Sequence, residues 1–536
     1  MHNAKTIEAS PPVAVGMPEQ NSWHISRQLS LNSLSGAVRF AILTGIYFLT
    51  YPYMLHSLGP ERFGLWALGL AVSQWIAAGD LGIAGSLMKF VPEHWNTRNI
   101  PRISQLATAG LLVIAPLGAI LVALVWAFRH DLLGLLSIPR QYRGDMMWLI
   151  LGMPIIFLIN LLASFISSII SGIQRMDISN FIYSATMGVS GVGIFFVLSR
   201  GYGLVGLMAN AALAAILWVV LLICAVRWLV PGLRIAPKLV QRSDVQELLH
   251  FGAYLQVAMF AGALAIPTVR VLLSRYVSLA SVSYFELASG MAMQARSFFI
   301  IVTLPLVPAT SHLASMQGHE KLSRLYRFSV RFLLFSALPA ALLIIVLAPS
   351  FIRIWLGSGV PYVASTFSLL GLAWMINAPA IPAYFMSQGL GYPKYQMYCQ
   401  CLVLLATATL GYFLVRTFGY YGAVMGLVLG IFVATVFIME RCHRLLNIRF
   451  REMWDISFLK VILVNVSLYL AVVYLLHGRT IGGLPELIFI SVGYIAVYVM
   501  LIISFRSIRG SDSEIGRAML PPFFSKFLFG RDATPD

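Results

Sequence analysis

Charged residues are scarce in this sequence. Asp, Glu, Lys and Arg make up only 11% of the 536 residues, against about 25% in ordinary globular proteins. Hydrophobic residues reach 59%, whereas a soluble domain has about 45 to 50%. Apolar runs of about 20 residues, the length of a membrane-spanning helix, recur along the chain, for example at Leu111–Phe128 and Met147–Ile170. A soluble fold is therefore excluded, and the composition predicts an all-α integral membrane protein.

Motifs for metal, nucleotide and covalent chemistry are missing as well. The four cysteines are too few and too scattered for a disulfide framework. The sequence has no His-Glu-x-x-His string and no phosphate-binding loop ending in Gly-Lys-Ser/Thr. Ser86-Leu-Met-Lys89 matches the Ser-x-x-Lys string of penicillin-binding enzymes, but the companion strings are absent. We therefore expect no enzyme activity, no cofactor and no metal site.

The basic residues follow the pattern of membrane topology. The net charge is +17, but Lys and Arg lie in short gaps between apolar runs, which excludes nucleic acid as a partner. Alternate gaps carry about 23 basic residues on the side of both termini and about 10 on the other. Both termini are therefore predicted to be cytoplasmic. Residues 1–33 have no signal-peptide pattern, so the first spanning helix should direct its own insertion.

We expect about fourteen transmembrane helices. They begin near Leu34, Gly64, Gln105, Met147, Asn180 and Leu204, near Leu248, Ala280, Val330, Pro361, Tyr395 and Tyr421, and near Ser457 and Pro485. The predicted organisation is a cytoplasmic tail at 1–33, an N-lobe at 34–230, a C-lobe at 248–440, two accessory helices at 457–505 and a cytoplasmic tail at 506–536.

An internal repeat relates the two lobes. Offsets of about 215 to 219 residues relate Gly36-Ala37 to Gly252-Ala253, Pro52 to Pro267 and Tyr202-Gly203-Leu204 to Tyr421-Gly422-Ala423. The repeat predicts two lobes of six helices each, and because six is even both lobes enter the membrane in the same sense and form parallel repeats. Pro52 with Pro267, and Pro154 with Pro379, fall in corresponding helices, where broken or bent helices would frame a central site; ordinary kinking is the alternative. Gly422, Gly426 and Gly430 predict close helix packing.

Four charged residues lie inside predicted helices, where each charge costs about 2.5 to 3.5 kcal/mol. They are the candidate substrate-binding residues Arg39, Asp80, Glu286 and Arg296. Arg39 and Arg296 lie in helices that would face each other across the lobes, and guanidinium groups match phosphate oxygens. The alternative is that both arginines pair with Asp80, Glu286 or helix carbonyls for stability. Arg270 and Lys89 are nearer helix ends, where snorkelling explains them.

The second predicted helix carries a family resemblance. Leu58-Gly59-Pro60-Glu61 through Phe63-Gly64-Leu65-Trp66-Ala67-Leu68, followed by Asp80-Leu81-Gly82 and Lys89-Phe90, resembles the polysaccharide (Wzx-type) flippases. These belong to the multidrug/oligosaccharidyl-lipid/polysaccharide (MOP) exporter superfamily, whose fold is MATE-like. The helix count and the repeat extend the resemblance to most of the chain.

The resemblance implies transport of an undecaprenyl-pyrophosphate-linked oligosaccharide across the bacterial inner membrane, for O-antigen, capsule or exopolysaccharide synthesis. It also implies alternating access, and a polysaccharide polymerase and glycosyltransferases acting on the same glycan. The family's cationic cavity agrees with Arg39 and Arg296.

Two other functions are weighed against this one. A MATE-type multidrug antiporter exports cations and needs acidic residues in its lobes; Asp80 and Glu286 favour it, and Arg39 in the first helix opposes it. A membrane polymerase or ligase usually carries a long outer loop, whereas the outer gaps of this chain are short. Flipping of a lipid-linked glycan is the function predicted here.

Overall fold

The computed structural model describes residues 19–74, 82–303, 306, 310, 319–449, 456–477, 479 and 481–504. Within these ranges the regular secondary structure is helical, with α-helices and short 3-10 turns and no strand. Ten of the described helices are long and apolar enough to cross a membrane. The predicted class, an all-α integral membrane protein, is confirmed, and the count of about fourteen spans stays a prediction.

The N-lobe is built from seven described helices and one 3-10 turn. They are α1 (Glu19–Gln74), α2 (Ile83–Asn96), α3 (Ile100–Ala127), α4 (Arg129–Leu135), η2 (Arg140–Tyr142), α5 (Arg143–Gly172), α6 (Met176–Ser199) and α7 (Gly203–Leu229). Helix α1 begins well before the expected start near Leu34, so part of the predicted tail is helical. Gly59, at a positive φ of 77°, divides α1 into two apolar halves, because glycine adopts this conformation at little cost.

The connection η3 (Pro237–Leu239) leads to the C-lobe. This lobe contains α8 (Arg242–Tyr276), α9 (Leu279–Thr303), α11 (His319–Leu356), α12 (Val363–Asn377), η4 (Ala378–Ala380), α13 (Ile381–Gly389) and α14 (Lys394–Leu445). Gly419, at φ 56°, divides α14 into two halves, close to the expected start near Tyr421. The accessory helices are α15 (Ile456–Leu476) and α16 (Leu484–Ser504), as the sequence predicts.

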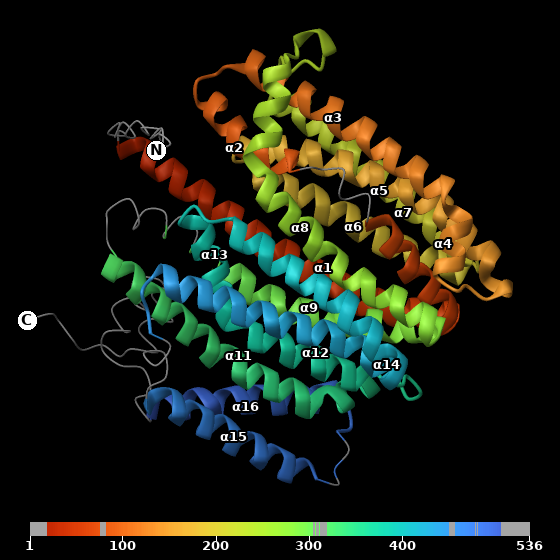
Figure 1. Cartoon of the computed structure of the whole chain (residues 1–536), viewed down its shortest axis with the longest axis vertical. Helices are drawn as coiled ribbons and strands as arrows, with labels where there is room; N and C mark the ends of the chain where they lie inside the picture. Colours follow the sequence, from red (N-terminus) through yellow and green to blue (C-terminus); the bar gives the residue numbers. More distant parts are fainter. Residues whose placement is uncertain are drawn as a thin grey trace, which may run out of the picture.

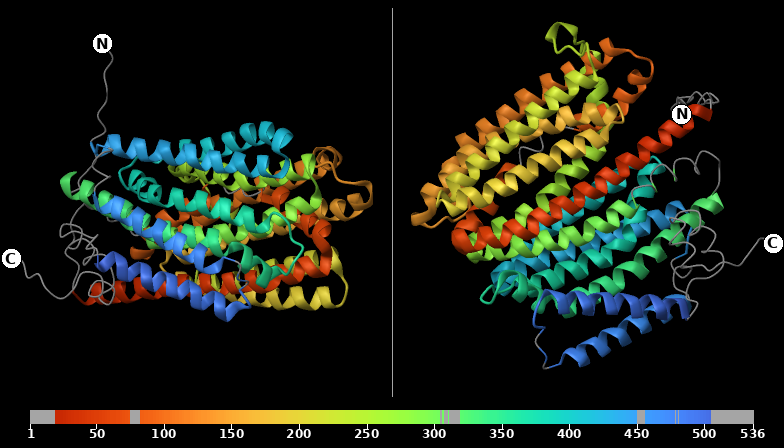
Figure 2. Two further views of the ribbon diagram at one scale, coloured as in Figure 1. Left: turned by 90° about the horizontal axis from the view of Figure 1, so that it is seen from below. Right: turned by 180° about the vertical axis from the view of Figure 1, so that it is seen from behind.

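The two lobes lie side by side as separate helix bundles, with α1 and α8 between them (Figure 1). Helix α1 packs against α6 of the N-lobe and α9 of the C-lobe, whereas α8 packs against α14 and also against α2 and α3. Helices α15 and α16 lie along α11, on the far side of the C-lobe (Figure 2). The described start of α1 and the end of α16 lie at the same end of the bundle (Figure 1).

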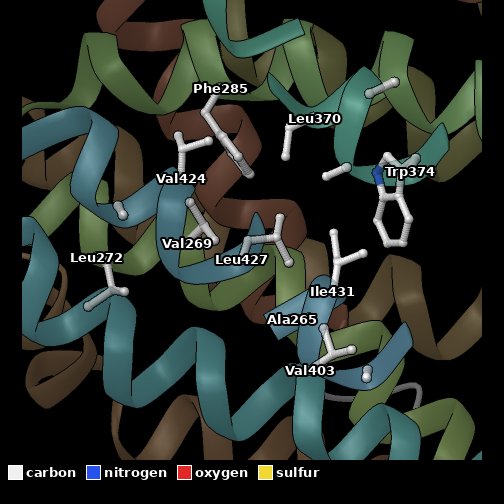
Figure 3. Packing of buried hydrophobic residues seen from close by; sticks show 14 of the residues in the cluster. Ala265, Val269, Leu272, Phe285, Leu370, Trp374, Val403, Val424, Leu427 and Ile431 are labelled. Atoms are coloured by element: carbon white, nitrogen blue, oxygen red, sulfur yellow. The ribbon is translucent and has the colours of Figure 1, made fainter. Parts of the chain in front are cut away.

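The C-lobe has a tightly packed apolar core. Figure 3 shows part of it, where Val269 of α8, Phe285 of α9 and Leu427 of α14 lie close together. A methyl group at Gly426 would collide with the backbone of Gly411 in the other half of α14. The predicted packing role is therefore confirmed for Gly426, because only a residue without a side chain lets the two halves approach so closely.

One of the four paired prolines lies in a 3-10 turn. Pro379 lies in η4, between α12 and α13, and the backbone on both sides of this turn remains right-handed helical. Pro52, Pro154 and Pro267 instead lie inside helices that continue through them. The expectation that these prolines break or bend corresponding helices around a central site stays a prediction. Among the four, only Pro379 lies in a 3-10 turn.

Candidate functional site

Helices α1 and α9 form an antiparallel interface between the lobes. The Tyr47 hydroxyl of α1 donates a hydrogen bond to the Leu287 carbonyl of α9 at 2.8 Å, and Ser283 donates one to the Pro60 carbonyl. We call this region, with Tyr47, Pro60, Arg270, Ser283, Glu286 and Leu287, the closed end of the interface. Direct helix-to-helix hydrogen bonds hold the two lobes together there.

The closed end contains a buried ion pair. Arg270 Nη2 of α8 lies 2.6 Å from Glu286 Oε2 of α9, and the two side chains are only 7% and 8% exposed. The snorkelling explanation for Arg270 is therefore wrong. Glu286 is therefore paired with Arg270, and not with Arg39 or Arg296 as the alternative proposed. Its role in substrate binding stays a prediction.

Arg39 lies near the other end of α1, where it contacts the N-lobe. Its Nη1 donates a hydrogen bond to Asn180 Oδ1 of α6 at 3.1 Å, and its guanidinium carbon lies 4.1 Å from the centre of the Tyr183 ring. A cation over an aromatic face is attracted by the ring quadrupole. Arg39 is thus held in place without a carboxylate partner among these contacts.

Arg296 lines a cavity of about 510 Å³ inside the C-lobe, formed by α8, α9, α12, α13 and α14. Its guanidinium carbon lies 4.1 Å from the centre of the Trp374 ring, and Trp374 belongs to the cluster in Figure 3. The buried Arg296 Nε has no hydrogen-bond partner among the described residues. The cavity therefore holds a cation with unused donor capacity, in walls that are mostly apolar.

The two arginines lie toward the same end of the interface. Thr44 of α1 hydrogen-bonds to Gln294 of α9 at 3.3 Å; Arg39 and Arg296 both lie beyond this contact, away from the closed end. By helix rise, Arg39 is about 30 Å from Pro60 along α1. We call the region of Arg39 and Arg296 the arginine end. The two guanidinium groups are not in contact in the described structure, and each contacts its own lobe.

The remaining candidate, Asp80, lies outside the described residues. Sequence reasoning missed Asn180, Tyr183 and Trp374, which position the two arginines. The sequence shows only that these three residues lie near the start or the middle of an apolar run. It does not show which face of the helix each side chain occupies. Among the described residues, no three His, Cys, Asp or Glu side chains are arranged to hold a metal ion.

A second contact between the lobes was also missed. Arg102 of α3 binds two carboxylates at the start of α8, Asp244 at 2.5 Å and Glu247 at 2.7 Å. Ser86 of α2 donates a hydrogen bond to the Leu248 carbonyl at 2.7 Å. We call the group of Arg102, Asp244 and Glu247 the α3–α8 clamp. It fastens the first turns of a C-lobe helix to the N-lobe.

Comparison with known proteins decides the family. A family model described as "Polysaccharide biosynthesis protein" matches residues 36–314, more than half of the chain. This chain belongs to that family. The matched region includes α1 from Gly36 onward, the α3–α8 clamp, both arginines and the closed end, so the family model covers both ends of the α1–α9 interface.

Three proteins similar to this chain in sequence or in fold are named as transporters or as a flippase. A putative O-antigen transporter of Shigella flexneri is 21% identical over 405 residues, covering 73% of this chain and 92% of the relative. An inward-facing multidrug resistance MATE family transporter of the MOP superfamily has a TM-score of 0.67, at 16% identity, covering 75% of this chain and 94% of that structure. The lipid II flippase MurJ, in an inward closed conformation, has a TM-score of 0.64, at 14% identity, covering 90% and 99%.

The structural likenesses establish a MATE-like fold, as predicted. The family membership and the described apolar helices give a multi-pass membrane protein of polysaccharide biosynthesis, and the similar proteins are named as transporters or a flippase, not as enzymes. The predicted resemblance to the polysaccharide branch of this superfamily is confirmed.

Proposed function

We propose that this protein is a flippase that moves an undecaprenyl-pyrophosphate-linked oligosaccharide across the bacterial inner membrane. The observation that carries the proposal is that this chain belongs to the polysaccharide biosynthesis family. In addition, its two lobes place two arginines, Arg39 and Arg296, at one end of their interface. The names of two similar proteins, an O-antigen transporter and a lipid II flippase, support the substrate class.

Arg39 and Arg296 are the proposed phosphate-binding residues. A guanidinium group presents paired N–H donors that match two phosphate oxygens, and Arg296 has a buried donor that no described residue uses. A pyrophosphate would supply the missing acceptors. The rings of Tyr183 and Trp374 hold the guanidinium groups without neutralising them, which keeps the site positive for an anion.

The glycan explains why a protein is needed for this step. Each unpaired sugar hydroxyl costs about 4 to 8 kcal/mol in hydrocarbon, so an oligosaccharide faces tens of kcal/mol. A polar path between the lobes would supply hydrogen-bond partners that replace water around the glycan, while the lipid tail stays in the bilayer.

We further propose that transport proceeds by alternating access. The closed end would separate when the arginine end closes, so that the phosphates are released on the opposite side. Outward movement of a roughly dianionic pyrophosphate from the negative interior to the positive exterior releases about 4 to 5 kcal/mol per 100 mV. Both termini, and therefore the arginine end, are placed on the cytoplasmic side in this proposal. A polysaccharide polymerase and glycosyltransferases would act on the same glycan.

The rival function is export of cationic drugs, as the MATE likeness would allow. That function needs an available carboxylate inside a lobe, and Glu286 is occupied by Arg270. An efflux assay with a fluorescent cation distinguishes the two functions. Dye export that disappears in Asp80→Asn would favour the antiporter and contradict the flippase.

The primary test is the pool of lipid-linked glycan in cells lacking the protein. We expect a pyrophosphate-linked oligosaccharide to accumulate while surface polysaccharide is lost, and a plasmid copy of the gene to restore both. A copy with Arg296→Ala, produced at the same level, should restore only a small part of the surface polysaccharide. An unchanged pool in the deletion strain would contradict the proposed function.

A further inference from the structure

A second large cavity lies outside the arginine end, on the surface of the C-lobe. It has a volume of about 960 Å³ and lies between α11, the α12–η4 junction and the second half of α14. We call it the α11–α14 groove. Its apolar wall includes Leu334, Phe432 and Val436, and its basic rim includes Arg331, Arg444 and Arg449. One end of the groove is therefore apolar and the other is cationic.

The apolar part of the groove is open to the surroundings. Phe432 is 52% exposed and Val436 is 54% exposed, on a helix apolar enough to span a membrane. From Phe432 to the end of α14 at Leu445 the helix rises about 20 Å, whereas one leaflet of the hydrocarbon core is about 15 Å thick. The groove thus extends from the middle of the bilayer to the headgroup region, about the length of an acyl chain.

The charge of the rim selects the headgroup. Arg444 and Arg449 carry the positive charge of the rim, beside Glu440, the one carboxylate among the described lining residues. Glu440 forms ion pairs with Arg444 and, at 3.5 Å, with the neighbouring Arg441, so its charge is already shared between two guanidinium groups. The rim keeps a net positive charge, which fits a phosphate group and repels a cation.

A thin wall separates the groove from the Arg296 cavity. Asn377, which lines the cavity, donates a hydrogen bond at 2.7 Å to Thr435, which lines the groove. Along α14, Ile431 and Ala434 face the cavity, whereas Phe432 and Thr435 face the groove. The two spaces are therefore distinct, and the groove does not continue the site of Arg296.

We propose that the α11–α14 groove binds an anionic phospholipid of the membrane leaflet on the side of the α14 C-terminus. Its phosphate contacts the arginine rim and an acyl chain lies along Leu334, Phe432 and Val436. The lipid differs from the transported substrate, because the groove is walled off from the arginine end. The inference does not depend on which molecule is exported.

Native mass spectrometry of the full-length protein tests this site. The purified protein is exchanged into detergent with equal amounts of phosphatidylglycerol and phosphatidylcholine, and retained lipid is counted. A basic residue near an anionic lipid contributes a factor of about five to binding, so Arg444→Gln with Arg449→Gln should reduce the preference for phosphatidylglycerol about 30-fold. The matched control, Lys238→Gln with Arg242→Gln, removes two exposed basic residues from the same predicted side and should change it less than threefold.

A second variant tests the groove without changing its charge. Val436→Trp places a large side chain at an exposed position in the apolar part and should reduce phosphatidylglycerol retention at least tenfold. Retention equal to wild type in Val436→Trp, or equal losses in the arginine variant and its control, would overturn the proposal. Displacement of phosphatidylglycerol by an equal concentration of a long-chain polyprenyl phosphate would also overturn it, because the groove would then belong to the carrier lipid.

Discussion

At the closed end of the lobe interface, Arg270 lies 2.6 Å from the carboxylate of Glu286. At the arginine end, Arg39 and Arg296 instead lie over the rings of Tyr183 and Trp374. In the part of the chain that the structure describes, neither of these two arginines forms an ion pair with a carboxylate. Arginine side chains thus lie at both ends of one interface. The arginine at the closed end is neutralised by a carboxylate, and the two at the arginine end keep their positive charge.

This difference indicates two separate roles for charge inside a membrane. A paired arginine stabilises the fold, because breaking a buried pair leaves an uncompensated charge. An arginine held by an aromatic face keeps its charge for a ligand. Variants at the closed end should therefore reduce stability first, whereas variants at the arginine end should reduce transport in a protein of normal stability.

The largest effect is expected from Arg270→Ala. Loss of one partner of a buried ion pair costs about 3 to 5 kcal/mol, so the solubilised protein should lose its folded peak at a much lower temperature in a size-exclusion assay. The double variant Arg270→Met with Glu286→Leu removes both charges and should regain most of the stability and the export. A stable but inactive double variant would show that Glu286 contacts substrate.

The next largest effect is expected from Arg296→Ala. Hydrogen bonds to charged groups contribute about 1.5 to 3 kcal/mol, so export should fall about 10- to 100-fold, measured as surface polysaccharide per unit of protein. Arg296→Lys should recover only part of it, since a point charge cannot match two phosphate oxygens. Arg200, 5.4 Å from the Phe196 ring centre on the exposed surface, gives the matched control Arg200→Ala, which should export normally.

Arg39→Ala should have a smaller effect on export, about 3- to 10-fold. Arg39 already donates to Asn180, so fewer of its donors are available to a phosphate than those of Arg296. A cation over an aromatic ring is worth about 0.5 to 1 kcal/mol at exposed sites, so the thermal stability should fall only slightly. If Arg39→Ala and Arg296→Ala both export normally, the arginine end is not the phosphate site.

Tyr47→Phe should give the smallest change. It removes one neutral hydrogen bond, to the Leu287 carbonyl, at a cost of about 0.5 to 1.5 kcal/mol. The melting temperature of the solubilised protein should fall by a few degrees while export continues. Loss of export at unchanged stability would mean that Tyr47 contacts the substrate and that the closed end does more than hold the lobes together.

The sequence predicted the fold well because long apolar runs and basic gaps depend only on local composition. The expected starts near Tyr395 and Ser457 agree with α14 and α15 within a residue or two. The pairing of Arg270 with Glu286 could not be predicted, because a helix that is apolar all round does not reveal which face meets its neighbour. For the same reason Trp374 gave no sign that it lies under Arg296.

The 3-10 turn at Pro379 is another feature that the sequence alone could not predict. A proline removes one backbone donor wherever it occurs, but whether the helix ends or continues depends on the packing around it. Pro154 and Pro379 fall in corresponding helices of the predicted repeat, yet only Pro379 lies in a 3-10 turn between two helices. The repeat in the sequence therefore predicts topology better than it predicts the shape of each lobe.

The α3–α8 clamp also bears on how the chain could be divided. Arg102 binds Asp244 and Glu247, and the backbone N–H groups of Arg234 and Ala236 donate to Ser104 and Thr108 of α3. The start of α8 is thus held by side-chain contacts in addition to the peptide bonds before it. We expect residues 1–240 and 241–536, made as two polypeptides in one cell, to assemble and restore export; a tag on one half should recover the other, and Arg102→Ala should reduce that recovery.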